Sequence, residues 1–215
     1  MNTKTNNNNN VPANQTARRT MHRIVFLGCG LVLALAFAVL KSQSVRAGYM
    51  NVSPPDVPAI IQVPAGNQLF RVGHAIGTQN YVCLSTGWAS PAYSPQATLF
   101  NEDQAQILTH FLSPNPAEAN IPRPTWQDSR DTSTVWANPV KDASYTPDPT
   151  AIPWLLLKVV GRMVRLTGGN RMTGTTYIQR LNTTGGLKPT TSCNEGDKFL
   201  VPYTADYYFY KAADQ

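Results

Sequence analysis

The pattern of apolar and polar residues along the chain favours short strands. Residues 68–76 alternate, with Phe70, Val72, His74 and Ile76 on one face. Residues 154–160 form a nearly continuous apolar run, which is typical of a central strand covered on both faces. Further short strands are expected at 60–63, 81–84, 97–100, 125–127, 132–136 and 172–181, and within 199–211.

Prolines and glycines divide these segments. The chain has 17 prolines, and all but Pro12 follow residue 48, which is too dense for long helices. A turn at 77–80 would join the first two strands into a hairpin, and 113–124, with four prolines, is expected to be a loop. Residues 101–112 could begin as a capped helical turn before extending. The fold predicted is all-β, an antiparallel sandwich or barrel of about 8–10 short strands with long Pro-rich loops.

The first 47 residues have the layout of a signal peptide. A basic, polar leader precedes 17 residues without a charge, 24–40, and Val45-Arg46-Ala47 places small residues before a cut at Gly48. An uncleaved anchor at 24–40 is the alternative, because 17 apolar residues reach the lower limit for spanning a bilayer. We therefore expect a secreted or periplasmic protein with an extended arm at 48–57 and a single β domain at 58–215.

The distribution of charged residues changes at the same boundary. Six of the 18 Lys and Arg residues precede Gly48, whereas all 12 Asp and Glu residues follow it. The expected mature chain therefore has no formal net charge, and the pI near 9.3 belongs to the leader. No nucleic-acid partner is expected, and a membrane would be met only through an uncleaved N-terminal segment.

Two of the three cysteines, Cys83 and Cys193, remain after residue 47. In an exported chain two cysteines suggest one disulfide, with two buried thiols as the alternative. A zinc site would require two further ligands at close spacing, which the histidines do not provide. No metal is therefore expected.

Several segments carry a resemblance to a known family. The chain resembles an uncharacterised exported family, domain of unknown function 3455, found in bacteria and fungi. The resemblance covers most of residues 58–211. It rests on the residues at 63–66, 79–83, 95–100, 110, 124–126, 151–157, 176–182, 185–186, 193 and 201–210.

The resemblance implies no activity, substrate or catalytic residue, because the family has none established. It does imply that Cys83 pairs with Cys193. Relatives run directly from the region of His110 into the Pro-Thr-Trp motif at 124–126, whereas this chain inserts residues around 115–121.

Motifs of common enzyme classes are missing from the sequence. No Gly-rich turn between a strand and a helix follows the predicted signal, which argues against a dinucleotide-binding dehydrogenase. No Gly-x-Ser-x-Gly elbow of a serine hydrolase occurs. We expect no cofactor.

The candidate ligand-binding residues lie in two groups. His110 and Trp126 flank the expected Pro-rich loop, and Asp128 follows closely, so that a loop closing on itself would bring a titratable ring and an aromatic face together. Arg180 and Asp206 are charges inside strand-like segments, where a buried ion pair or a pocket floor would satisfy them. His74, on an apolar face, is expected to be a core residue.

The tyrosines of the last strand alternate. Tyr203, Tyr207 and Phe209 share one side, and Tyr208 and Tyr210 share the other. A core on one side and an interface on the other is the simple interpretation, and a sugar-stacking platform is the alternative.

Two function classes remain. The favoured one is a noncatalytic extracytoplasmic binding or surface module for a small molecule or a surface glycan. The other is a small secreted hydrolase-like or lyase-like enzyme that uses His110. An enzyme should show a pocket in which His110 meets Asp128, Arg180 or Asp206, whereas a binding module needs no convergent titratable groups.

Overall fold

The computed structural model of the protein describes residues 53–89, 94–164 and 169–213. The expected signal peptide, the possible anchor at 24–40 and the first part of the arm lie outside these residues. Within the described ranges, no helix has the length and apolarity needed to cross a membrane.

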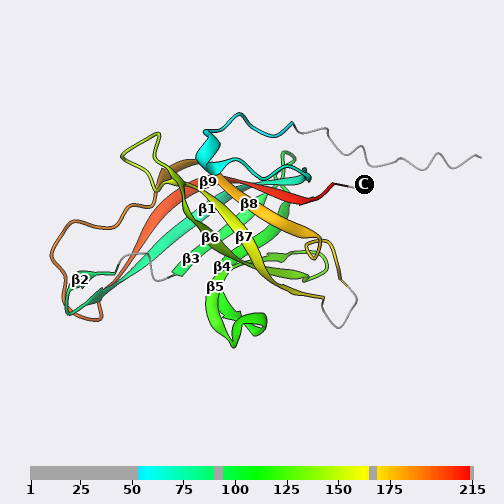
Figure 1. Cartoon of the computed structure of the whole chain (residues 1–215). Helices are drawn as coiled ribbons and strands as arrows, with labels where there is room; N and C mark the ends of the chain where they lie inside the picture. The colour runs from blue at the N-terminus through cyan, green and yellow to red at the C-terminus, as the bar shows by residue number, and fades with distance from the viewer. Residues whose placement is uncertain (1–52, 90–93, 165–168, 214–215) are drawn as a thin grey trace, which may run out of the picture. The chain divides into compact units, whose positions relative to one another are not determined.

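Strands dominate the described chain. Consecutive strands from β3 to β9 pair antiparallel, β1 pairs with β3, and β1 also pairs with β9, so the sheet closes into an eight-stranded barrel with β2 as an extra strand on β1 (Figure 1). The all-β prediction is confirmed, and the architecture is the barrel. The strands are β1 (Asn67–Leu84), β2 (Gly87–Trp88), β3 (Ser94–Phe100), β4 (Gln106–Asn115), β5 (Ile121–Asp128), β6 (Thr134–Tyr145), β7 (Trp154–Met163), β8 (Thr175–Gly185) and β9 (Lys198–Ala212).

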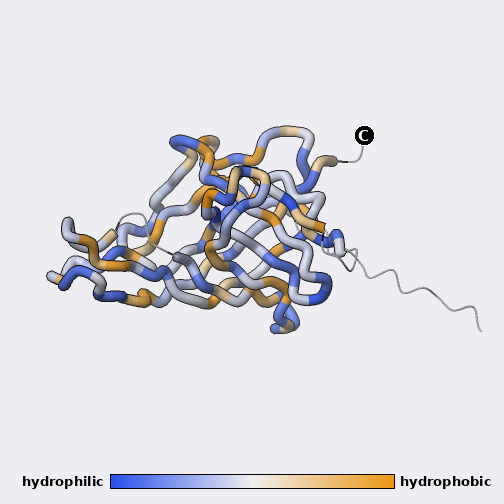
Figure 2. The backbone as a smooth tube through the Cα atoms, turned by 90° about the horizontal axis from the view of Figure 1, so that it is seen from below, coloured by the Kyte–Doolittle hydropathy of each residue, from blue (hydrophilic) through white to orange (hydrophobic). Residues whose placement is uncertain are grey.

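The main core lies inside the barrel. Side chains of alternate residues point inward along each strand, because the side-chain period of a strand is two. Figure 2 shows the resulting mixture of apolar and polar positions along the strands. In β9, Tyr203, Tyr207 and Phe209 point into this core and are almost fully buried, as the alternation predicted.

A second core lies outside the barrel wall. The segment before β1 forms a short 3-10 helix, η1 (Ala59–Ile61), instead of the strand expected at 60–63. Ile61 is fully buried there against Leu156 and Leu181, and its carbonyl accepts a hydrogen bond from the Gln179 amide at 2.8 Å. The apolar run of β7 is thus covered on both faces, and Tyr208 packs beneath the arm.

β1 differs from the prediction in two respects. It runs without a turn through Gly77, because this glycine allows β3 to approach closely: a Cβ at Gly77 would collide with the Gln96 carbonyl and with Ala97. The face assigned to the core is correct only at Phe70, which packs against the main core at the bulge between Leu69 and Arg71. Beyond it Ile76 is 64% exposed, and the inward residues are those of odd number, such as Ala75 and Tyr81.

The expected loop at 113–124 is a hairpin. β4 and β5 pair through Asn115 and Ile121, and the short 3-10 helix η2 (Pro116–Glu118) turns the chain between them. The tip lies within 115–121, where the resemblance implied an insertion. The expectation of a helical start at 101–112 also gives way to a turn followed by β4.

The prolines fit this hairpin because of its register. Pro114 faces Pro122, and Leu112 faces Pro124, so all three prolines occupy positions of one parity. An antiparallel ladder exchanges hydrogen bonds only at every second pair, and at the other pairs the N–H points to the opposite side. The β3–β4 ladder ends at His110 and the β5–β6 ladder ends at Thr125, so all three prolines lie beyond the last residues that pair with β3 or β6. No neighbouring strand therefore needs the N–H group that a proline lacks.

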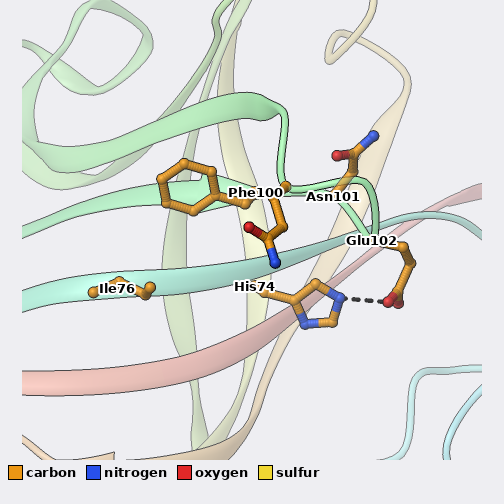
Figure 3. Close-up of a pocket in the computed structure, with 6 residues that line it drawn as sticks. His74, Ile76, Phe100, Asn101 and Glu102 are labelled. Carbon is orange, nitrogen blue, oxygen red and sulfur yellow. Dashed lines mark hydrogen bonds and ion pairs between the residues drawn. The ribbon is translucent and has the colours of Figure 1, made fainter.

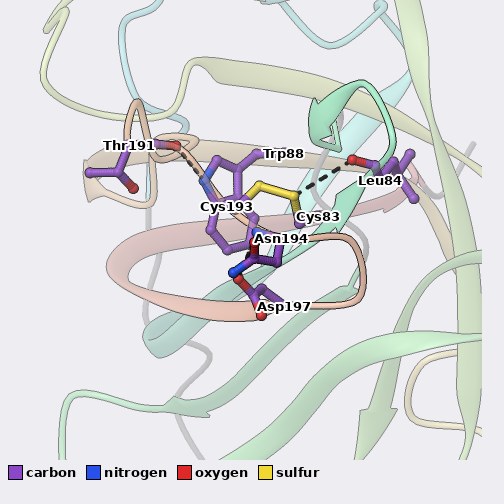
Figure 4. Close-up of a disulfide and its surroundings, with 7 residues drawn as sticks. All are labelled: Cys83, Leu84, Trp88, Thr191, Cys193, Asn194 and Asp197. Atoms are coloured by element: carbon purple, nitrogen blue, oxygen red, sulfur yellow. Dashed lines mark hydrogen bonds between the residues drawn. A yellow bond between two sulfur atoms is a disulfide. The ribbon is translucent and has the colours of Figure 1, made fainter.

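A disulfide links the far end of β1 to the segment before β9. Cys83 and Cys193 are bonded, which confirms the expected pair and removes both sulfurs as zinc ligands (Figure 4). Backbone hydrogen bonds of 2.8 Å join Cys83 to Asp197 and to Gly196, and the Trp88 indole donates to the Thr191 carbonyl at 3.0 Å. This end of the barrel wall is therefore held both covalently and by the backbone.

Candidate functional site

One end of the barrel encloses a cavity of about 690 Å³. Its lining comes from all eight strands of the barrel and from the segments just before β7 and just after β8. Pro122, Pro139, Leu187 and Lys188 are exposed at the mouth, and more deeply buried side chains lie below them.

An aromatic cluster forms the inner wall of the cavity. His110 and Trp126 are opposite each other in the β4–β5 ladder, and their rings stack with centroids 4.2 Å apart and planes 11° apart. The Tyr207 ring meets His110 at 5.3 Å and Trp126 at 5.5 Å. His110 and Trp126 therefore come together as predicted, but through a cross-strand pair rather than through a closing loop.

The His110 ring is neutral. Its Nδ1 lies 2.9 Å from the Thr125 carbonyl, which can only accept, so Nδ1 carries the proton and Nε2 presents a lone pair. Burial, assisted by the charge of Arg180, lowers the pKa of His110 to about 3 despite the hydrogen bond to Thr125. Nε2 has no hydrogen-bond partner among the described residues.

Arg180 brings a positive charge into the cavity from β8. Its Nε and Nη2 donate to the Pro153 carbonyl at 3.2 and 2.8 Å. Its charge also acts on Tyr207 and partly offsets the rise that burial causes in the pKa of that hydroxyl. The Tyr207 hydroxyl lies 3.3 Å from that of Tyr203. Burial raises the pKa of both tyrosines, so the hydroxyls remain protonated.

One donor at the cavity is unsatisfied. Trp126 is 1% exposed, and its indole Nε1 is buried without a hydrogen-bond partner in the described parts of the chain. Such a group costs about 1–3 kcal/mol, so a native structure that retains one calls for an explanation.

Asp128 lies inside the barrel but away from the cavity. Like Trp126, it points into the barrel. It lies two residues further along β5 than Trp126 and is therefore nearer the end of the barrel opposite the cavity. There one carboxylate oxygen meets Arg71 at 2.7 Å, and the other accepts the backbone N–H groups of Arg130 and Asp131. Arg71 also contacts the buried Met172, so Arg71, Asp128 and Met172 together close the end of the barrel opposite the cavity.

Asp206 lies on the outer face. It accepts from Asn182 at 2.8 Å and bonds His74 Nδ1 at 2.7 Å, while His74 Nε2 meets Glu102 at 3.0 Å. Burial works against the charge of His74, but the hydrogen bonds and charges of the two carboxylates outweigh it and raise its pKa. His74 is thus a half-exposed member of a charged cluster and not a core residue.

This cluster borders a second hollow, on the outside of the barrel. His74 and Ile76 from β1 lie beside Phe100, Asn101 and Glu102, and Figure 3 shows His74 directed towards Glu102. The hollow is more open than the cavity, and both nitrogens of its histidine are already engaged.

The structure therefore unites three of the five candidate residues. His110, Trp126 and Arg180 line one cavity, whereas Asp128 and Asp206 lie elsewhere. Arg180 and Asp206 do not form an ion pair with each other, because they point to opposite sides of the barrel wall. Tyr207 was missed as a site residue, although its position in the alternation of β9 placed it on the inner face.

Comparisons with known proteins identify a family and add no activity. No curated protein and no solved structure matches the chain. One family model matches residues 64–211, which is more than half of the chain and reaches from before β1 to the last residue but one of β9. The chain belongs to the family described as protein of unknown function (DUF3455).

Proposed function

We propose that the protein is a noncatalytic binding module that takes a small molecule into the cavity at the end of its barrel. The observation that carries the proposal is the cavity itself, about 690 Å³ in volume, with mostly apolar walls and a few polar groups. Sites for small ligands have this size and composition, and an eight-stranded barrel is just wide enough to hold one small ligand.

The chemistry of His110 supports binding over catalysis. A general base works best with a pKa near the operating pH, and that of His110 is lowered to about 3. Its Nδ1 is held by a backbone carbonyl, and no carboxylate from the described residues lines the cavity. The enzyme alternative retains one supporting observation, the convergence of His110 with Arg180.

A small molecule suits the site better than a surface glycan. Glycans stack on exposed aromatic rings, and the tyrosines of β9 provide no such platform. Tyr203 and Tyr207 point into the barrel, Tyr210 is 3% exposed, and Tyr208 packs beneath the arm.

We further propose that binding takes place outside the cytoplasm, with the protein secreted or periplasmic. The signal-like segment at 1–47 and the disulfide between Cys83 and Cys193 are compatible with an oxidising compartment. Sequencing of the amino terminus of the exported protein would find a start near Gly48, and a retained Met1 on membrane-bound material would point to an anchor.

The binding proposal can be tested with two bulky substitutions. Leu155→Trp adds volume inside the cavity, whereas Ile76→Trp places the same ring on the outer face beside the second hollow. A library of small molecules with apolar bodies and neutral, acidic or basic head groups is screened by thermal shift, and hits are titrated by calorimetry. We expect Leu155→Trp to abolish binding and Ile76→Trp to leave it unchanged. The converse result would move the site to the outer hollow, and no hit against the wild-type protein would refute the proposal.

A further inference from the structure

The polar groups of the cavity also indicate what kind of molecule it takes. Resting on the proposed function, we infer that the ligand is an organic carboxylate: an apolar body inside the barrel and a carboxylate bound by Arg180. Charge, hydrogen-bonding capacity and wall composition each support this class.

The charge of the cavity is positive. The charged side chains that line it within the described residues are Arg180 and Lys188. The ion pairs of the described chain use Arg71, His74 and Arg123, and none includes Arg180. Arg180 is half-buried, and its hydrogen bonds go to the neutral carbonyl oxygen of Pro153. A desolvated cation without a counter-ion is costly, and an anionic ligand would supply the missing charge.

The hydrogen-bonding capacity selects oxygen acceptors. A guanidinium has five N–H donors in a planar fork, and Arg180 directs only Nε and one Nη2 donor at Pro153, so the fork is not saturated. Carboxylates match this fork geometry and form short, charge-assisted bonds with it. The free donors of Arg180 would be satisfied by oxygen atoms of the ligand.

His110 adds one complementary element. Its Nε2 lone pair can accept a hydrogen bond, and the neutral ring does not repel a cation or attract an anion. A ligand with a hydroxyl group next to its carboxylate could therefore donate to His110 while it binds Arg180. Arg180 and His110 together fix the orientation of one end of the ligand.

The remaining wall is apolar and stiff. Leu112, Ile152, Leu155 and Leu157 line it together with five prolines, of which Pro122 and Pro139 are exposed at the mouth. Burial of the apolar body there would contribute about 25 cal/mol per Å² of surface removed from water. Low polarity also strengthens the interaction of Arg180 with a carboxylate relative to water.

The test compares ligands that differ only at the head group. Decanoate, 1-decanol and decylamine, and the corresponding naphthalene carboxylate, alcohol and amine, are titrated into the wild-type protein by calorimetry. We expect the carboxylate to bind at least about tenfold more tightly than the alcohol, since hydrogen bonds between charged groups are stronger than those to a neutral hydroxyl, and the amine to bind most weakly. Equal affinity for acid and alcohol would overturn the carboxylate inference and leave the binding proposal intact. No binding of any member, together with no hit in the library screen, would refute the binding proposal itself.

Variants then assign the carboxylate to Arg180. Arg180→Gln is expected to reduce the acid-to-alcohol ratio to near one while alcohol affinity changes less than about threefold. The matched control is Arg162→Gln on the outside of β7, which also donates to a backbone carbonyl, that of Thr175, and should keep the ratio. Retention of the ratio in folded Arg180→Gln, or its loss in Lys188→Gln instead, would overturn the assignment. Circular dichroism verifies that each variant is folded. If Arg180→Gln does not fold, Arg180→Lys replaces it, and its acid-to-alcohol affinity ratio should lie between that of the wild type and one.

Discussion

The ion pair at the closed end of the barrel allows a sharp test of what Asp128 does. Its carboxylate is 1% exposed and meets Arg71, which is 19% exposed, at 2.7 Å. Arg71→Leu leaves that carboxylate buried without its partner, and the expected loss of unfolding free energy is about 3 kcal/mol. Asp128→Asn removes the charge but keeps an oxygen for the backbone N–H groups of Arg130 and Asp131, so its expected loss is smaller, about 1–2 kcal/mol.

The double variant reveals the coupling. With both charges removed, no unpaired ion stays buried, so Arg71→Leu/Asp128→Asn should be more stable than the sum of the single losses by at least about 1.5 kcal/mol. Guanidinium unfolding at pH 7 measures all four proteins. Arg130→Leu, at an exposed arginine nearby, is the control and should stay within about 0.5 kcal/mol of the wild type. Additivity of the two single losses would refute the reasoning.

The same variants separate structure from function at this position. Asp128 was a candidate ligand-binding residue, but it lies away from the cavity. Asp128→Asn should therefore keep the affinity for any cavity ligand, although its melting temperature falls. A tenfold loss of affinity in the folded variant would return Asp128 to the site.

Further variants test the covalent link, a buried histidine and a close backbone approach. Cys83→Ser/Cys193→Ser should lose about 2–4 kcal/mol of unfolding free energy, seen as a lower denaturation midpoint, because the link closes a long loop; an unchanged midpoint would contradict this. His110, with a folded pKa of about 3, binds its proton less readily than the unfolded chain, so stability should fall as pH drops from 6.5 towards 3, by up to about 1.4 kcal/mol per unit. His110→Gln should flatten that dependence in pH-resolved unfolding, and an unaltered slope would count against a neutral His110. Gly77→Ala should destabilise by more than about 2 kcal/mol, since its Cβ meets the Gln96 carbonyl, and a near-native melting temperature would contradict the close approach.

Local pattern predicted the class of the fold but not its closure. Alternation along β9 identified the inward residues Tyr203 and Tyr207, because a strand repeats every two residues. Whether the sheet becomes a sandwich or a barrel depends on the pairing of β1 with β9, which are far apart in sequence. Turn residues were also ambiguous. Gly77 allows close approach within a strand, and the prolines of the β4–β5 hairpin are permitted by a register that the sequence does not display.

The site was predicted in part for similar reasons. His110 and Trp126 were identified as neighbours, although a cross-strand pair brings them together and not a loop. Arg180 was singled out as a charge within a strand, and it does lie at a cavity. Asp128 shares the inward parity of Trp126, but two residues along a strand shift a side chain by about 6.6 Å, which is enough to reach the other end of the barrel. Alternation along a strand predicts which face a side chain lies on. Its position along the barrel axis depends on how the strands assemble.

The pairing of β1 with β9 also determines how the domain must be made. Residues 67–82 pair with residues 198–212, so the seam of the barrel joins the first strand to the last. A chain that emerges from its amino terminus cannot close this seam until β9 has also been made. Contacts of such long sequence separation slow folding, and β1 presents an unpaired edge in the meantime. Seam closure should therefore be the late step of folding, with Cys83–Cys193 bond formation locking the strands once they have met.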